Sequence, residues 1–218
     1  MFPNFEEVMN KSLVDYIEGT VIPRYDGFDA GHGREHVLAV IAEAVRLAGF
    51  YPVDVDMVYV AAAYHDTGLS VDRKTHHLES GRIIRSDKRL GEWFTQEQIE
   101  VIAQAAEDHR ASSDHEPRSV YGKIIAEADR QIIPESIILR TVQYGFKHYP
   151  ELDKDGHWRR TCEHMAEKYD EGGYLKLWIP ESRNAEGLAV LRSIIHNESR
   201  LRAMFEAAYS DCIKSQGL

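Results

Sequence analysis

The stretch Val55–Gly68, VDMVYVAAAYHDTG, decides the fold. Its apolar side chains recur every three or four residues, as on one face of an α-helix: Val55, Val58 and Ala62. A turn and N-cap precede it at Pro52-Val53-Asp54, and Gly68 is a helix-ending residue. The stretch therefore predicts a helix over Val55–Asp66 that carries the polar pair His65-Asp66 at its end.

The same helical period runs through most of the chain, and no alternating strand pattern or internal repeat interrupts it. Prolines stand at the breaks between helices, where they are tolerated: Pro117, Pro134, Pro150 and Pro180. The fold class is therefore predicted to be all-α. The remaining helices are expected at Phe5–Val21, from Gly33 to Gly49, and at His76–Lys88, Gln96–His109, Arg118–Ile133, Glu135–His148, Trp158–Glu171 and Ala185–Ser210.

The composition excludes several classes of protein. The 218 residues are 43% hydrophobic and 28% charged, which is typical of a globular protein and not of a disordered or fibrous one. No run approaches the roughly 20 apolar residues of a membrane span, and Met1–Glu7 has no signal-peptide pattern. Two cysteines are too few for a disulfide framework, so we expect a cytoplasmic protein. A net charge of −10 argues against general nucleic-acid binding.

The segment Lys147–Gly156, KHYPELDKDG, is the predicted internal boundary because it is polar and contains a helix-breaking proline. We expect residues 1–150 to form a helical core that carries the site. Residues 151–218 are expected to form a helical extension packed on that core.

Six side chains that bind metals lie on the apolar faces of predicted helices: His36, His65, Asp66, His77, His109 and Asp129. Alone, each has a simpler explanation, because a single buried histidine is usually a hydrogen-bonded core residue and an aspartate at a helix end is usually a cap. Two buried carboxylates without partners, however, would cost several kcal/mol each, and no lysine or arginine lies on these faces. A divalent cation would satisfy the whole set.

The other histidines are expected to have different roles. His76 lies about 100° around its helix from His77, so we expect it to be exposed or to support a ligand. His32 precedes a helix and is free to bond backbone or substrate. Cys162 and His164 have no second pair with zinc-finger spacing.

Four motifs carry a family resemblance. They are GHGREHV at 31–37, AAYHDTG at 62–68, HLESG at 77–81 and EADR at 127–130. Their order resembles the HD-domain metal-dependent phosphohydrolase superfamily over residues 28–150, with the C-terminal extension similar to that of small bacterial members. Glu127 stands where the family motif has aspartate.

The resemblance implies an HD-like bundle of helices with a divalent transition metal at its centre: Mn, Fe, Co, Ni or Zn. The first ion would be held by His36, His65, Asp66 and Asp129. A second would be held by His77 and His109, with Asp66 bridging, so one or two ions are implied. Asp66, His77 and His109 would then be the catalytic residues.

The implied reaction is hydrolysis of a phosphomonoester or phosphoanhydride of a small molecule, such as a nucleotide, by a water that the metal activates. Cations near the motifs are the candidates for binding substrate phosphate: Arg34, Lys74, Arg110 and Lys123. Thr67–Val71 lacks the acidic pair of the guanosine-tetraphosphate hydrolases and the lysine of the cyclic-dinucleotide branch. Two alternatives stay open: a di-iron oxygenase of the same superfamily, and a non-catalytic binding domain. The sequence leaves a homo-oligomer open as well.

Overall fold

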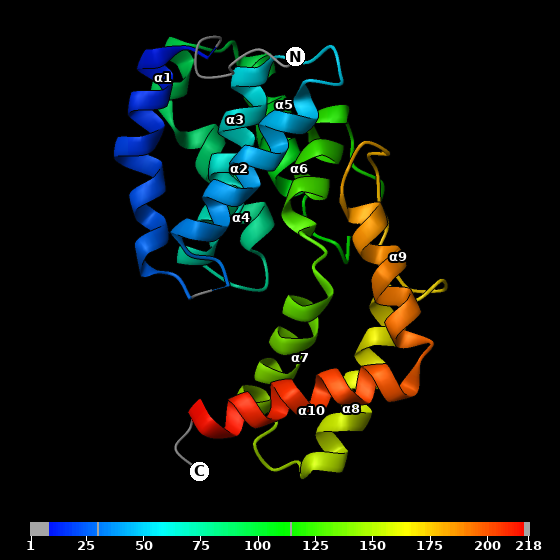
Figure 1. The fold of residues 1–218 in the computed structure, drawn as a ribbon. Helices are drawn as coiled ribbons and strands as arrows, with labels where there is room; N and C mark the ends of the chain where they lie inside the picture. Colours follow the sequence, from blue (N-terminus) through cyan, green and yellow to red (C-terminus); the bar gives the residue numbers. More distant parts are fainter. Residues whose placement is uncertain (1–8, 30, 114, 216–218) are drawn as a thin grey trace. The chain divides into compact units, whose positions relative to one another are not determined.

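The computed structural model describes residues 9–29, 31–113 and 115–215, and this part of the chain contains helices and no strand (Figure 1). The all-α prediction is confirmed. The predicted helix Phe5–Val21 begins in residues outside the described part. The chain divides into two compact units. The first comprises the described residues up to Arg130 together with Trp178–Ser182, and the second comprises residues 131–177 and 183–215.

The described part of the first unit holds several short helical elements and five longer helices. The short elements are α1 (Lys11–Tyr16), η2 (Ile17–Val21), η3 (Ile22–Gly27), η4 (Thr67–Ser70) and η5 (Lys88–Glu92). The longer helices are α2 (Arg34–Ala48), α3 (Val55–Tyr64), α4 (His76–Ser86), α5 (Gln96–Glu107) and α6 (Val120–Arg130).

Helix α3 is the centre of this unit. The side chain of Asp54 caps its N-terminus by accepting from the backbone N–H groups of Asp56 and Met57. Every residue of α3 from Met57 to Tyr64 is buried, and α2, α5 and α6 all pack against it. The small side chains of Ala61–Ala63 allow this close approach. The helix therefore delivers its C-terminal end to the middle of the unit.

The segment Trp178–Ser182 is attached to the first unit through Glu127, a fully buried carboxylate on α6. Glu127 accepts hydrogen bonds from the backbone N–H of Trp178 at 2.7 Å and from the hydroxyl of Ser182 at 2.6 Å. The segment is also held by Glu181, which accepts from the hydroxyl of Tyr51 at 2.6 Å. These bonds place part of the predicted C-terminal extension within the metal-site unit.

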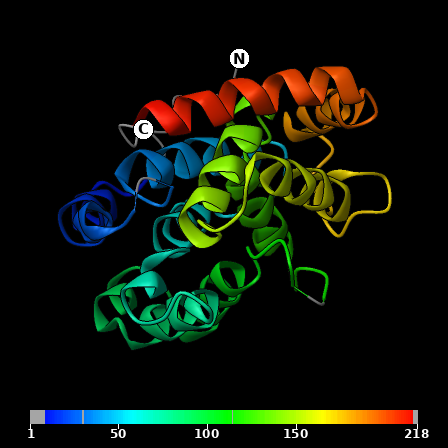
Figure 2. The same ribbon diagram turned by 90° about the horizontal axis from the view of Figure 1, so that it is seen from below.

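The second unit contains α7 (Pro134–His148), α8 (Lys154–Tyr169), α9 (Asn184–Ile195) and α10 (Glu198–Ser215). Helix α7 packs against α8 and α10 (Figures 1 and 2), with Val142 and Phe205 in one apolar cluster. The second unit therefore begins at Gln131, whose positive φ of 37° ends α6. This boundary differs from the predicted one at residue 150, because the apolar face of α7 is buried against the later helices.

None of the helices within the described residues combines the length and the low polarity that crossing a membrane requires.

Candidate metal centre

The pair His65-Asp66 follows the last residue of α3. His65 keeps a helical backbone, whereas Asp66 leaves the helix at φ −107° and ψ 3°. The buried hydroxyl of Tyr25 stabilises this turn: it donates to the carbonyl of Ala63 at 2.8 Å and accepts from the N–H of Asp66 at 3.3 Å. Both side chains of the pair are held in the interior, with exposed fractions of 0% for His65 and 2% for Asp66.

The first turn of α4 lies against the backbone just after this pair. The hydroxyl of Ser80 accepts a hydrogen bond from the N–H of Gly68 at 2.9 Å. A Cβ atom at Gly68 would overlap the carbonyl oxygen of His76, so only glycine permits this approach. The start of α4 is thereby brought next to Asp66.

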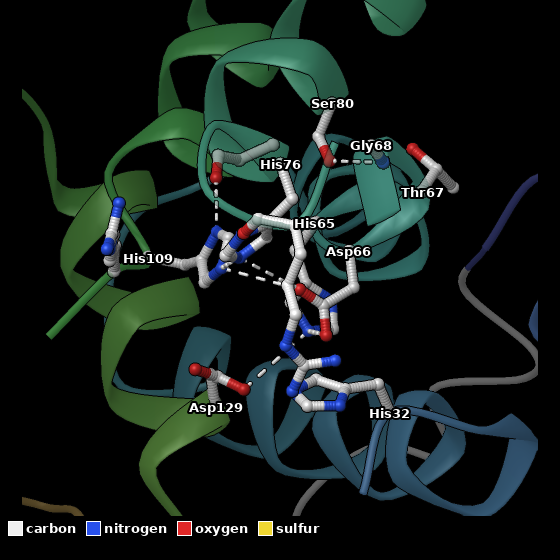
Figure 3. Close-up of polar contacts among 12 residues, drawn as sticks. His32, His65, Asp66, Thr67, Gly68, His76, Ser80, His109 and Asp129 are labelled. Carbon is white, nitrogen blue, oxygen red and sulfur yellow. Dashed lines mark hydrogen bonds and ion pairs between the residues drawn. The ribbon is translucent and has the colours of Figure 1, made fainter. Parts of the chain in front are cut away.

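Two groups of metal-binding side chains share Asp66 (Figure 3). One group adds His36 and His65, and the other adds His76 and His109. The Oδ2 atom of Asp66 lies 3.3 Å from Nε2 of His65, and Oδ1 lies 3.4 Å from Nε2 of His76. Each carboxylate oxygen of Asp66 therefore faces one of the two groups.

Asp129, on α6, joins the first group. Its Oδ1 atom is 3.2 Å from Nε2 of His36 and 3.6 Å from Nε2 of His65. The Nε2 atoms of His36 and His65 are 3.3 Å apart, and those of His76 and His109 are 3.0 Å apart. The structure thus brings all the predicted metal-binding side chains together except His77.

The side chain that lies with Asp66 and His109 is that of His76, whereas the sequence assigns this place to His77. The apolar face that His77 shares with Gly81 and Ile84 packs toward α5, where Gly81 meets the side chain of Glu107. His76 is the first residue of α4, so its direction is set by the preceding turn, where its Nδ1 bonds the carbonyl of Arg73 at 2.9 Å. The hydrogen bond between Gly68 and Ser80 brings this residue next to Asp66.

The protonation of three histidines follows from their Nδ1 partners. Each Nδ1 lies within hydrogen-bond distance of a backbone carbonyl: His65 with Ala62 at 2.7 Å, His76 with Arg73 at 2.9 Å and His109 with Ala106 at 2.6 Å. A carbonyl only accepts, so each Nδ1 carries a proton and donates it. The Nε2 atoms are left to offer their lone pairs to the cluster, the arrangement usual for histidine ligands of metals.

The charges of the cluster oppose the effect of burial. Burial raises the pKa of Asp66. The neighbouring His65 and His109 lower it by more than burial raises it, so the pKa of Asp66 lies below its usual range. Hydrogen bonds with His36 and His65 likewise hold the pKa of Asp129 well below its usual range against burial. Burial lowers the pKa of His109 to about 4, so its neutral form is ready to bind a cation. Burial lowers the pKa of His65 as well, but the two carboxylates raise it well above its usual range; a bound ion would displace that proton.

The donor set fits a divalent transition metal. Imidazole and carboxylate ligands about 2.0–2.2 Å from a tetrahedral ion are about 3.3 Å from one another, and the closest donor pairs here are 3.0–3.6 Å apart. The lone pair of His109 Nε2 faces His76 Nε2 and requires a positive partner, either a proton on His76 or a metal ion. Two groups that share a carboxylate can hold one ion or two.

The predicted phosphate-binding cations are placed differently from one another. Arg34 makes a double hydrogen bond with Asp26 at 2.8 Å, and Lys123 pairs with Glu116 at 2.5 Å. Lys74 is exposed, and its carbonyl accepts a hydrogen bond from Arg110 at 2.8 Å. Arg110 follows His109 directly. The structure thus gives Arg34 and Lys123 acidic partners, and links Lys74 and Arg110 to each other.

Two further polar groups lie near the cluster. The His32 ring lies 6.0 Å from that of His36, edge to face, and its Nδ1 is 2.8 Å from Asp29, which also accepts from Arg73 at 2.7 Å. This bond between loops holds His32 beside the cluster. Asp108, which directly precedes His109, accepts from the backbone and guanidinium of Arg118 at 2.7 and 2.9 Å.

Comparison with known families identifies this arrangement. The family model described as HD domain matches residues 33–131. These 99 of the 218 residues are similar in sequence to HD domains. The match contains every residue of the two groups, from His36 to Asp129, and it confirms the resemblance seen in the sequence. The HD domain belongs to a superfamily of metal-dependent hydrolases. No curated protein and no solved structure matches the chain.

Proposed function

We propose that this HD-domain protein is a metal-dependent phosphohydrolase that acts on a small phosphorylated molecule. The observation that carries the proposal is the pair of donor groups that share Asp66. Three of the four histidines have their Nδ1 atoms bound to backbone carbonyls, so their Nε2 atoms are preorganised for a cation. A set of buried imidazoles and carboxylates without such a cation would weaken the fold.

The residues divide into roles around the cation. His36, His65, Asp66 and Asp129 would hold a first ion, and His76, His109 and Asp66 would hold a second. A divalent transition metal bound there (Mn, Fe, Co, Ni or Zn) would supply a water activated at neutral pH and would neutralise charge on the phosphoryl oxygen. Asp66, ionised and turned toward both groups, would orient this water by accepting a hydrogen bond from it.

The substrate is a phosphomonoester or phosphoanhydride, with nucleotides the first compounds to test. Arg110 and Lys74 are the remaining candidates for binding a phosphate of the substrate, because Arg34 and Lys123 already have acidic partners. The net charge of −10 disfavours long nucleic acids as substrates. With only two cysteines in the chain, we place the enzyme in the cytoplasm.

Release of phosphate tests this function. Protein stripped with a chelator is reloaded with Mn²⁺ or Co²⁺ and offered a panel of nucleotides and sugar phosphates. We expect metal-dependent release, abolished in Asp129→Asn and retained in the matched control Asp211→Asn, which changes a carboxylate whose side chain is 69% exposed. If no compound releases phosphate while the metal content is confirmed, the hydrolase assignment is wrong.

A second candidate, a di-iron oxygenase, is favoured by the same bridging position of Asp66. Carboxylates and histidines also hold pairs of iron ions in proteins. Anaerobic loading with Fe²⁺, followed by EPR and by oxygen uptake with candidate substrates, separates the two functions. Iron without a coupled signal eliminates the oxygenase.

A further inference from the structure

A cavity of about 440 Å³ is lined by residues of the start of α4, the end of α5 and the loop that follows α5. This volume is within the range of small-molecule sites. Polar side chains supply most of its lining: His77, Glu107, Arg110, Ser112, His115 and Arg118. All belong to the first unit, and none is a member of the two metal-binding groups.

Two pairs of sequence neighbours link this cavity to the cluster. In the pair His76-His77, the first residue belongs to the cluster and the second lines the cavity. The pair His109-Arg110 divides in the same way. The rings of His76 and His77 are only 5.7 Å apart. A residue of the cluster and a residue of the cavity lining are therefore neighbours in space.

Among the described residues of the lining, Arg110 is a cation without an acidic partner. Glu107 accepts from Arg85 at 2.5 Å and from Arg118 at 2.7 Å, and Arg118 also pairs with Asp108 at 2.7 Å. These charges compensate one another. Arg110 has no carboxylate partner among the described residues, and its guanidinium donates one hydrogen bond there, to the carbonyl of Lys74. The cavity is consequently positive at Arg110, in a chain whose net charge is −10.

Hydrogen-bond donors surround that cation. The Nδ1 atom of His77 is buried and has no hydrogen-bond partner in the described structure. The hydroxyls of Ser112 and Ser113, which also line the cavity, make no hydrogen bond within that part of the chain either. An unpaired guanidinium with free hydroxyl and imidazole groups beside it is the chemistry that binds a phosphate oxygen.

From these observations we propose that the cavity binds a second phosphate group of the substrate, so that the enzyme prefers small molecules with two phosphates on different positions. The inference rests on the proposed hydrolase function for the first phosphate. That phosphate lies at the metal cluster, and the second is held by the guanidinium of Arg110, with His77 and Ser112 donating hydrogen bonds. Arg110 and His77 are binding residues in this scheme, and neither takes part in the chemical step.

Binding of inorganic phosphate tests the cavity independently of turnover. The full-length chain is freed of metal, so that the ionised Asp66 and Asp129 disfavour phosphate at the cluster, and is titrated while amide NMR signals are recorded. We expect saturable shifts at Ser112 and Ser113, with affinity reduced about tenfold or more in Arg110→Ala. The matched control is Arg24→Ala, because Arg24 is also exposed and also bonds a single backbone carbonyl. This control should bind as the wild type does.

Substrate preference gives the second measurement. The metal-loaded enzyme is compared on fructose 1,6-bisphosphate against fructose 6-phosphate, and on adenosine 3′,5′-bisphosphate against its monophosphates. We expect a kcat/KM ratio in favour of the bisphosphates of about 10- to 100-fold. Arg110→Ala should bring this ratio close to one, Arg110→Lys should keep part of it, and Arg24→Ala should keep all of it.

The results separate the two proposals. The cavity proposal is wrong if the amide signals of Ser112 and Ser113 do not shift on addition of phosphate, or if Arg110→Ala keeps the bisphosphate preference. The hydrolase proposal stands in both cases, provided that phosphate release depends on metal. If the cavity binds phosphate in an Arg110-dependent way but no compound is hydrolysed, the hydrolase proposal fails and the anion site remains.

Discussion

Replacing His76 or His77 by alanine distinguishes the two neighbours that sequence periodicity interchanges. His76 supplies one of the three donor residues of the second group, with its Nε2 atom 3.0 Å from His109 and 3.4 Å from Asp66. His77 supplies none. We therefore expect His76→Ala to lose one bound ion and His77→Ala to keep the wild-type metal content.

The size of the effect follows from the number of donors left behind. Loss of a partner that only supports a ligand lowers metal affinity about 10- to 100-fold. Loss of His76 removes the ligand itself and leaves two donor residues, so we expect the second ion to bind at least about 100-fold more weakly, or about 2.8 kcal/mol. The first ion keeps His36, His65 and Asp129 in addition to Asp66.

Metal content after dialysis, measured by mass spectrometry, and calorimetric titration with Mn²⁺ or Zn²⁺ give the result. Circular dichroism of both variants serves as the folding control. Wild type and His77→Ala should bind the same number of ions, and His76→Ala should bind one fewer. If His77→Ala loses an ion while His76→Ala does not, the assignment of the second group is wrong.

Three further changes test the structure around the site. Tyr25→Phe leaves the carbonyl of Ala63 and the N–H of Asp66 without their buried partner. It should lower the free energy of unfolding, measured in urea, by about 1–3 kcal/mol. An unchanged midpoint of the urea unfolding curve would contradict this. Gly68→Ala places a methyl group on the first carbonyl of α4, so we expect loss of the second ion and a lower Tm, with Gly19→Ala, where nothing lies within 4 Å, as the control. Burial raises the pKa of Asp29, but hydrogen bonds from a histidine and an arginine lower it to about 2. Its stabilising effect is therefore complete above pH 4 and is lost as the pH falls toward 2; Tm should fall less steeply in this range for Asp29→Asn, and equal slopes would refute the argument.

The helical fold was predictable because burial repeats with the period of the helix. Helix α3 begins at Val55, as the cap and the apolar pattern predict, but it ends at Tyr64 and not at Asp66. The turn that follows depends on the hydroxyl of Tyr25, which comes from a distant part of the chain. Helix ends set by such contacts are not visible in local sequence.

The ligand positions were predictable where a side chain points to the centre of the bundle. This holds for His36 and for His109, which continue the apolar faces of α2 and α5. It fails at the start of α4, because Gly81 and Ile84 mark the face that packs on α5 while the first residue faces the end of α3. When a helix begins at a metal site, the ligand comes from its first turn. The face on which the rest of the helix packs does not predict which residue of that turn is the ligand.

The two histidine neighbours also show why the site and the cavity are expected to work together. His76 and His77 leave the same turn of α4, and His109 and Arg110 leave the same end of α5, so each helix end contributes to both places. A shift of either helix end therefore moves a cluster donor and a cavity residue at once. Gly68 and Ser80 set the position of α4, and the loop after α5 positions Arg110 and Ser112, so the spacing between the reactive phosphate and any second anionic group depends on both. Selectivity for the separation of two phosphates is the property that such an arrangement favours.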